Sequence, residues 1–328
     1  MKHMFIKAVM SACLLASGFV AAHAAASGSY PDRPIKIVVG FVPGGPTDLY
    51  ARIAAHGLEQ ILGQQFVVEN LAGASGAIAA ATVAKSKPDG YTLLVNVVSD
   101  IITPLAKKNP GYNLEKNFSP IGLIADAPNV LVVNRGVPVD TLKGLIDYAR
   151  RHPHTINYGS AGTGTVSHLA GALLASAAGI DITHVPYKGT NGAQMDLLAG
   201  RVSMMFDNLT NGLANAKAGK VKALAVTSPQ RWPGAKDLPT MAELGFPGVT
   251  ISSVFGLMAP AGTPKPVVEK LSRALAKVLQ NKAYREKIVQ SGAQPGALDA
   301  KEYGEYIAKE SRRWKLFLQK HPGIIPAE

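Results

Sequence analysis

The sequence is poor in cysteine and in aromatic residues, and each shortage excludes a class of protein. Cys13 is the single cysteine among 328 residues, so an intramolecular disulfide bond and a cysteine-based zinc site are both excluded. Aromatic residues make up 6% of the chain and do not interleave with the basic clusters, which argues against a nucleic-acid partner. Apolar residues make up 47% of the chain, which is typical of a globular protein, and the length suffices for two domains.

Patterns of metal and nucleotide sites are also missing. The histidines show neither a His-x-x-x-His nor a His-Glu pattern. No Gly-Lys-Ser or Gly-Lys-Thr follows a glycine-rich turn, and the spacing of Gly159, Gly162 and Gly164 differs from that of a dinucleotide fingerprint. We therefore expect no metal and no cofactor, ATP and NAD included.

The N-terminus has the pattern of a secretory signal. A basic start precedes an apolar stretch from Ala8 to Val20, and Ala22-His23-Ala24 fits the small-x-small cleavage rule. The stretch is shorter than the roughly 18 to 20 residues that span a bilayer, which disfavours an uncleaved anchor. We expect residues 1–24 to be removed by cleavage near Ala24, so that the protein reaches the periplasm in soluble form.

Basic side chains outnumber acidic ones, by 34 to 22, and the net charge is +12. Such a field favours small anions, because it steers them toward the protein. The alternative is that the basic clusters are solvated faces without a partner. The clusters are Lys107-Lys108, Arg150-Arg151 and a C-terminal group of Arg312, Arg313, Lys315 and Lys320.

Strand and helix patterns alternate along the chain. Residues 35–41 form a β-branched run, a Pro-Gly-Gly-Pro turn follows, and residues 49–62 repeat apolar side chains at helical spacing. This alternation indicates a mostly parallel sheet with both faces covered. The other predicted strands are 66–69, 91–97, 130–133, 156–159, 183–187, 202–206, 221–226 and 251–258, and the other predicted helices are 77–85, 142–151, 166–178, 194–199, 267–280 and 300–317.

The order of these elements favours two α/β units. The stretch 103–119 has no regular pattern, and a second series of strands and helices begins after it. If the last strand and helices return to the first unit, the chain crosses between the units near residues 125–130 and 226–249. Paired crossings of this kind act as a hinge.

The Pro-Gly-Gly-Pro turn is the first candidate binding loop. A proline at the first helical position leaves backbone N–H groups near the helix start unpaired, and the positive end of the helix dipole attracts an anion there. Asp48 has two interpretations that can coexist: it caps the helix, or it faces the ligand and accepts an ammonium group. The residues expected to hold a carboxylate are Pro43, Gly44, Gly45, Pro46, Thr47 and Asp48.

A second candidate loop, residues 158–168, also lies between a predicted strand and a predicted helix. It holds four serine or threonine side chains, three glycines and no acid, so nothing within it neutralises the helix dipole. The alternative is an ordinary connection whose hydroxyls cap the helix and whose His168 packs in the core. The residues expected to contact an acceptor-rich ligand are Ser160, Gly162, Thr163, Thr165 and His168.

Two strand ends give further candidates. Ser99 follows the strand predicted at 91–97 and Asp207 follows the one at 202–206, and open α/β sheets bind ligands at such carboxyl edges. Asp207 could equally cap a helix. Ser160 and His168 allow a rival hypothesis, an exported serine hydrolase, although the Gly-x-Ser-x-Gly elbow of many hydrolases is absent.

Seven motifs occur in order over almost all of the chain that follows the signal. They are Phe41-Val42-Pro43-Gly44-Gly45-Pro46-Thr47-Asp48, Tyr91-Thr92-Leu93-Leu94, Gly159-Ser160-Ala161-Gly162, His184-Val185-Pro186-Tyr187-Lys188-Gly189, Phe206-Asp207-Asn208, Ala223-Leu224-Ala225-Val226-Thr227 and Ala259-Pro260-Ala261-Gly262-Thr263-Pro264. Together they resemble the Bug family of extracytoplasmic receptors, the substrate-binding components of tripartite tricarboxylate transporters.

The resemblance implies a two-lobed α/β receptor of the type II periplasmic fold, in which a hinge of two crossing segments joins two mixed, mostly parallel sheets. We expect residues 25–126 and 250–328 to form lobe 1 and residues 127–249 to form lobe 2, with the ligand between the two loops. The implied monomer catalyses nothing. It captures a mono-, di- or tricarboxylate, or an acidic amino acid, for membrane permease subunits; a sensor kinase is the alternative partner.

Three departures from the family pattern lie near the expected cleft and hinge. Asn191-Gly192-Ala193 and the segment 211–215 replace stretches that commonly carry proline. Phe255 stands where the family usually has Trp or Tyr. The identity of the ligand of this chain therefore cannot be inferred from the ligands of other members.

Overall fold

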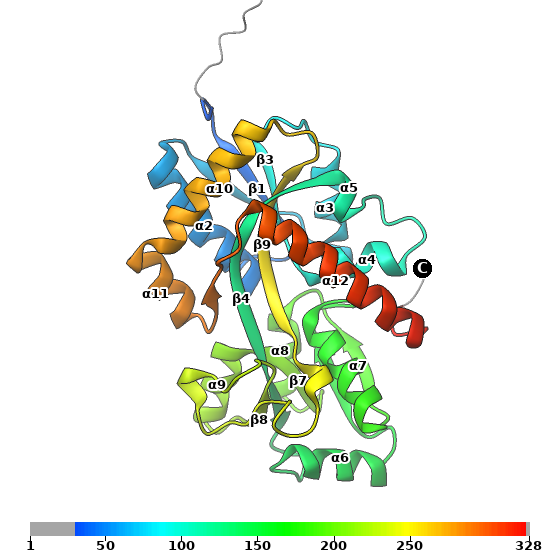
Figure 1. Ribbon diagram of the computed structural model, residues 1–328. Helices are drawn as coiled ribbons and strands as arrows, with labels where there is room; N and C mark the ends of the chain where they lie inside the picture. The colour runs from blue at the N-terminus through cyan, green and yellow to red at the C-terminus, as the bar shows by residue number, and fades with distance from the viewer. Residues whose placement is uncertain (1–29, 326–328) are drawn as a thin grey trace, which may run out of the picture. The chain divides into compact units, whose positions relative to one another are not determined.

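The computed structural model describes residues 30–325 (Figure 1). The predicted signal, residues 1–24, and its cleavage site near Ala24 lie outside the described residues. Residues from Arg33 onward form one structural unit, and the fold below is the fold of this unit. None of the helices within residues 30–325 combines the length and the apolar character needed to cross a membrane.

The first part of the unit alternates strands and helices. β1 (Ile35–Val39) pairs in parallel with β2 (Phe66–Asn70) on one side and with β3 (Thr92–Asn96) on the other. α2 (Pro46–Leu62) connects β1 to β2, and it ends at Gly63, whose left-handed conformation favours glycine. The remaining elements of this part are η1 (Ala74–Gly76), α3 (Ala77–Ala84), α4 (Val98–Ala106) and α5 (Leu114–Asn117).

β4 (Phe118–Asn134) is one long strand that belongs to both parts of the sheet. Its residues 118–128 pair antiparallel with β9 (Ser252–Pro260), which also pairs with β3. Its residues 129–134 pair antiparallel with strands of the second part instead. Figure 1 shows β4 and β9 running side by side from one part into the other.

The sequence-based prediction for this region is wrong in its boundaries. The strand predicted at 130–133 begins already at Phe118, within the stretch predicted to be irregular. Register shifts near Pro120 and Leu123 accommodate a proline and a glycine in the strand, and they interrupt the regular alternation of side chains. The second crossing lies at β9, later than predicted, because residues 226–249 fold back against the second part through bonds such as Met241 N–H to Val226 O.

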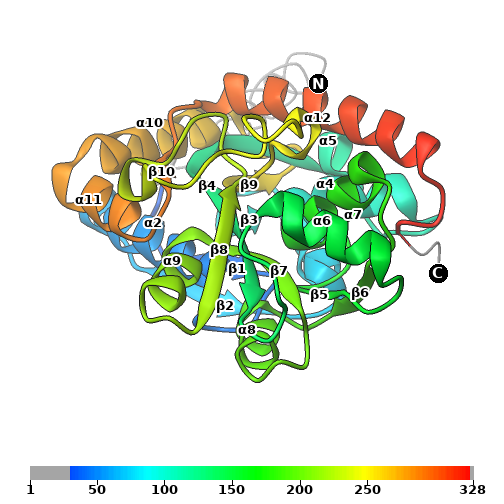
Figure 2. The ribbon, with the colours of Figure 1, turned by 90° about the horizontal axis from the view of Figure 1, so that it is seen from below.

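Helices cover both faces of the sheet in the second part (Figure 2). Leu131 and Val133 of β4 pack in one core with residues of α6 (Leu142–Arg151) and α7 (Val166–Ala178). Val130 and Val132 pack in another core with residues of α8 (Thr190–Leu198) and α9 (Leu209–Lys217), since successive side chains of a strand point to opposite faces.

The second part has two parallel and two antiparallel strand pairings. β5 (Asn157–Ser160) lies between β6 (Thr183–Pro186) and β7 (Met204–Asn208) and is parallel to both. β7 and β8 (Val221–Val226) each pair with β4. The short helices η2 (Pro233–Ala235) and η3 (Pro247–Val249) follow β8.

The C-terminal helices pack against the first part. α10 (Lys265–Gln280) contacts α2 and β4, and α12 (Ala300–Lys320) contacts β4 and α4. Asp299 and Glu302 each accept a hydrogen bond from the backbone N–H of the other, which fixes the start of α12. α11 (Lys282–Gln290) and β10 (Gln294–Pro295) connect the two long helices.

Candidate functional site

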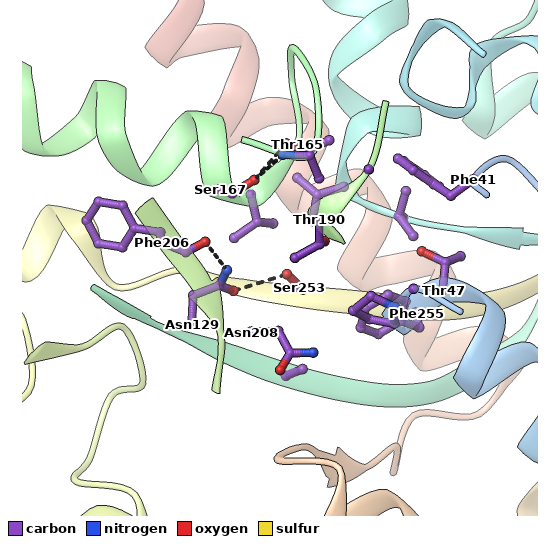
Figure 3. A pocket seen from close by; sticks show the side chains of 18 of the residues that line it. Phe41, Thr47, Asn129, Thr165, Ser167, Thr190, Phe206, Asn208, Ser253 and Phe255 are labelled. Carbon is purple, nitrogen blue, oxygen red and sulfur yellow. Dashed lines mark hydrogen bonds between the residues drawn. The ribbon is translucent and has the colours of Figure 1, made fainter. Parts of the chain in front are cut away.

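A cavity lies where the two parts of the unit meet, at the beginnings of five helices. α2 and α4 come from the first part, and α7, α8 and α9 come from the second; each contributes its N-cap and first residues. Asn129 of β4 and Ser253 and Phe255 of β9 also line the cavity (Figure 3). The cavity thus occupies the carboxyl ends of the strands, where open α/β sheets bind ligands.

The first predicted loop reaches the cavity with three of its six residues, Gly45, Pro46 and Thr47. Pro46 is the first residue of α2, and its N-cap, Gly45, has no side chain that could occupy the unpaired N–H groups of the first turn. Gly44 has φ +81°, a conformation that other residues adopt with strain, so the turn needs this glycine. Pro43 and Gly44 complete the turn without lining the cavity.

The Asp48 carboxylate is buried and directed into its own loop. One oxygen accepts hydrogen bonds from Gly44 N–H (3.1 Å) and Arg52 Nε (2.9 Å), and the other accepts from Asn70 Nδ2 (3.0 Å). Burial raises the pKa of Asp48, but the hydrogen bonds outweigh burial and the net pKa lies below its ordinary value. Asp48 therefore holds the loop in place, and it does not line the cavity.

Of the five residues predicted in the second loop, Thr165 alone lines the cavity. Its Oγ1 donates to Gly162 O (2.6 Å) and lies 3.1 Å from Ser167 Oγ, which accepts from Ala161 N–H at 3.0 Å. Ser167, which was not singled out from the sequence, also lines the cavity. These bonds fix the two hydroxyl groups at the start of α7.

The other predicted residues of the second loop lie elsewhere. Gly162 and Thr163 line a neighbouring groove, which Lys188 also borders. Ser160 and His168 are buried and do not line the cavity.

Ser160 and His168 do not form a catalytic pair. Ser160 Oγ is fully buried and lies 2.6 Å from Nε2 of His184, while His168 Nδ1 accepts a hydrogen bond from Gly164 N–H at 3.1 Å. The two imidazole rings stack at 3.9 Å. Burial, with the neighbouring ring, lowers the pKa of His168 to about 3, and burial lowers the pKa of His184 to about 4, so both rings are neutral at physiological pH.

The two strand-end candidates differ in where they point. Ser99 lines the cavity, and its Oγ donates to Ser75 O at 2.6 Å. Asp207 is buried and does not line the cavity, although its neighbours in the sequence, Phe206 and Asn208, do. Both oxygens of Asp207 accept hydrogen bonds from Gln194 Nε2 (2.9 and 2.8 Å). Burial raises the pKa of Asp207 to about 7, although the hydrogen bonds from Gln194 and Asn208 N–H oppose this rise.

Polar residues on the crossing strands were missed by the sequence analysis. Asn129 Nδ2 donates to Phe206 O (3.0 Å), and Asn129 Oδ1 accepts from Ser253 Oγ (3.1 Å), as Figure 3 shows. The backbone of Asn129 exchanges hydrogen bonds with Thr227. Thr190 at the start of α8 lines the cavity as well. Gly189, the N-cap of α8, marks the start of this helix in the sequence, and that signal could have identified Thr190 as a candidate.

No charged side chain and no histidine of residues 30–325 lines this cavity. Its positive field comes from the helix starts, each equivalent to roughly half an elementary charge. Such an arrangement can bind an anion through backbone N–H groups and hydroxyls. Across the described residues, no group of three His, Cys, Asp or Glu side chains is placed to hold a metal ion.

The mixed α/β fold, the two crossing strands and the cavity between two parts define a two-lobed solute-binding receptor of the periplasmic type. The chain belongs to the tripartite tricarboxylate transporter family receptors, abbreviated TctC, whose family pattern matches residues 50–322. The predicted fold class and family are therefore confirmed. Members of this family are receptors and not enzymes, so the hydrolase hypothesis is wrong and the chain is not an enzyme.

Several relatives are similar over nearly the whole chain. Protein BugT of Bordetella pertussis is 36% identical over 288 residues, covering 87% of this chain and 88% of BugT. The structure of the periplasmic binding protein BugD is 38% identical with a TM-score of 0.82, covering 89% of this chain and 98% of BugD.

Two similar structures contain small carboxylates. R. palustris Rpa4515, solved with adipate, is 37% identical with a TM-score of 0.84 and covers 88% of this chain and 97% of its own. MatC (Rpa3494) from Rhodopseudomonas palustris, with bound malate, is 33% identical with a TM-score of 0.81 and covers 87% of this chain and 99% of its own.

Proposed function

We propose that this protein captures a small carboxylate in the periplasm and delivers it to the permease subunits of a tripartite tricarboxylate transporter. The observation that carries the proposal is the convergence of five helix starts on one cavity that no charged side chain lines. A carboxylate is the small anion that such N–H donors and hydroxyls bind well.

Both parts of the unit supply donors to the proposed ligand. The first turn of α2 offers the N–H groups of Thr47 and Asp48, since proline precedes them and Leu49 is the first residue to bond back to Gly45. The first turn of α7 offers the N–H groups of residues 166–168 in the same way, because Leu169 is the first residue of this helix whose N–H bonds back, to Thr165 O. A ligand that contacts both parts gains donors that neither part supplies alone, and this differential affinity favours closure.

The relatives support the choice of ligand. Adipate and malate, bound in two similar structures, are small dicarboxylates. The crossing strands support the idea of a hinge, and we place the lobes at residues 25–126 with 250–328 and at residues 127–249. We further propose that the mature protein is a monomer released by cleavage near Ala24.

Titration calorimetry with a panel of organic acids, adipate and malate among them, tests the proposal. A ligand that binds only the folded protein at about 100 times its Kd adds about 2.7 kcal/mol of stability, so a shift in Tm accompanies binding. We expect at least one acid to bind and to raise the Tm. The absence of binding by every acid would contradict the carboxylate assignment.

Transport measurements test the proposed partner. Deleting this receptor should abolish uptake of the identified acid through the permease, and the intact chain should restore it. Normal uptake in the deletion strain would favour a sensor kinase over a permease as the partner.

A further inference from the structure

The two parts of the unit meet at backbone distance where Gly292 faces Thr210. Gly292 lies two residues after α11 in the first part, and Thr210 is the second residue of α9 in the second part. A methyl group on Gly292 would lie 2.4 Å from Thr210 Oγ1 and 3.0 Å from the Thr210 backbone nitrogen. Rotation of the threonine hydroxyl relieves the first contact but not the second. A side chain at position 292 therefore requires the two parts to move apart.

A second close approach lies on the other side of the crossing strands. Figure 1 shows α11 facing α9 on one side of β4 and β9, and α4 facing α7 on the other. Gly162 precedes α7, and a methyl group on it would lie 2.7 Å from Ser75 Oγ of the first part. Ser75 has φ +54°, which is uncommon for a residue with a side chain, and its carbonyl oxygen accepts from Ser99 Oγ at 2.6 Å. Its own part thus fixes Ser75 against Gly162.

Gly63 separates the two reasons for which a glycine can be needed at position 292. Gly63 and Gly292 both follow a helix of the first part and have similar left-handed conformations, with φ +70° and +80°. Alanine at either position therefore pays a similar conformational cost. Gly292 is buried against the second part, whereas Gly63 is exposed and a methyl group on it would meet no atom within 4 Å. Only Gly292 bears on how closely the two parts approach.

We infer that Gly292 and Gly162 are closure positions, at which the absence of a side chain lets the two parts approach closely enough to hold the ligand between them. The inference rests on the proposed function, in which the ligand contacts both parts. Apparent affinity falls with the population of the arrangement that is competent to bind. A side chain at either position lowers that population, because its contacts belong to the approached arrangement and not to the fold of either part.

The pair Gly292→Ala and Gly63→Ala tests the inference by titration calorimetry of the whole protein with adipate and malate. We expect Gly292→Ala to weaken binding by about tenfold or more, and Gly63→Ala to leave it unchanged. The Tm without ligand should fall by similar amounts in both variants, since both pay the conformational cost. Wild-type affinity in Gly292→Ala, or an equal loss of affinity in both variants, overturns the inference and leaves the proposed function intact.

A disulfide bond tests the close approach without a ligand. Cys13, in the predicted signal, is the single natural cysteine, so introduced cysteines have no competitor later in the chain. Side chains at positions 292 and 210 place their Cβ atoms within the reach of a disulfide, about 3.5–4.5 Å. We expect Gly292→Cys combined with Thr210→Cys to cross-link under mild oxidation, measured by loss of free thiols. The control, Gly63→Cys combined with Thr210→Cys, should keep both thiols.

The cross-link separates failure of the inference from failure of the proposed function. Free thiols in the 292–210 pair after oxidation, at a Tm equal to that of Gly292→Ala, overturn the inference whatever ligand binds. A cross-link in a protein that binds no organic acid supports the close approach and contradicts the carboxylate assignment alone.

Discussion

Asp48 and Asp207 are both buried acids next to the cavity, one in each part of the protein, but their partners differ. Asp48 has a cation, Arg52, at 2.9 Å, whereas Asp207 has the neutral donors Gln194 and Asn208. The pKa of Asp48 accordingly lies below its ordinary value, and burial raises the pKa of Asp207 to about 7. An acid can thus lie beside an anion site either by pairing with a cation or by keeping its proton.

The two arrangements have opposite effects on stability as the pH changes. Asp48 contributes stability above its unfolded pKa near 3.8, and this contribution is lost as the pH falls through its lower folded pKa. For Asp207 the folded state binds more protons than the unfolded state between about pH 4 and 7, so its contribution falls as the pH rises through that window.

Removing the Asp48 carboxylate is the change with the largest expected effect. In Asp48→Ala, Gly44 N–H loses its acceptor and Asn70 Nδ2 loses one of its two, so the free energy of unfolding should fall by about 2–3 kcal/mol. Urea unfolding at pH 7 measures this, with Glu59→Ala on the same helix as the control. A loss equal to that of the control would show that the loop does not depend on Asp48.

Neutralising Asp207 should change how stability depends on pH. Asp207→Asn removes the ionisation, so the free energy of unfolding of the variant minus that of the wild type should increase from pH 5 to pH 7, by at most about 1.4 kcal/mol per pH unit. Urea unfolding at several pH values measures this difference, with the exposed Asp237→Asn as the control. A difference independent of pH would contradict the raised pKa.

Hydroxyl groups, and not a charged side chain, hold the shape of the loop before α7, and a substitution of Thr165 tests this. Thr165→Val keeps the side-chain volume but loses the bond to Gly162 O, at a cost of about 0.5–1.5 kcal/mol in stability or ligand binding. Thr163→Val, which changes a residue outside the cavity, is the matched control. Calorimetry with the bound acid should show weaker binding for Thr165→Val alone; equal losses would contradict the assignment of the lining.

Removing the cation should make Asp48 more similar to Asp207. Arg52 is half exposed, so Arg52→Met should reduce stability by less than about 1 kcal/mol. The pKa of Asp48 should nevertheless rise, because burial then lacks its main opposing contact. An NMR titration of the Asp48 carboxyl carbon measures this, with Arg273→Met on α10 as the control. An unchanged pKa would assign the lowering to Gly44 and Asn70.

The alternation of strands and helices was predictable because most elements have strong periodic patterns. The boundaries failed where composition and structure conflict. Pro120 and Pro128 lie inside β4, although proline is uncommon within strands, and the register shifts that accommodate Pro120 depend on β9, which is distant in the sequence. α9 was missed because its asparagine- and glycine-rich sequence has low helix propensity, and Asn208 caps it by accepting from Asn211 N–H.

The candidate site was predictable as two loops, but not residue by residue. Neighbouring residues of a helix point about 100° apart, so Thr47 can line the cavity while Asp48 points into the loop. His184 and Asn129 gain their partners from strands far away in the sequence, and no local pattern reports such contacts. Periodicity identifies an exposed or buried face, whereas the direction of each polar group depends on tertiary neighbours.

The shared strand β4 gives the receptor a mechanical property. Asn129 and Ser253 lie on the segments that cross between the parts, so an occupant of the cavity contacts the strands that would bend in the proposed hinge. If the hinge acts as proposed, a small rotation at β4 and β9 displaces residues far from the cavity more than it displaces the lining itself. Occupancy would then change the surface that the proposed permease contacts.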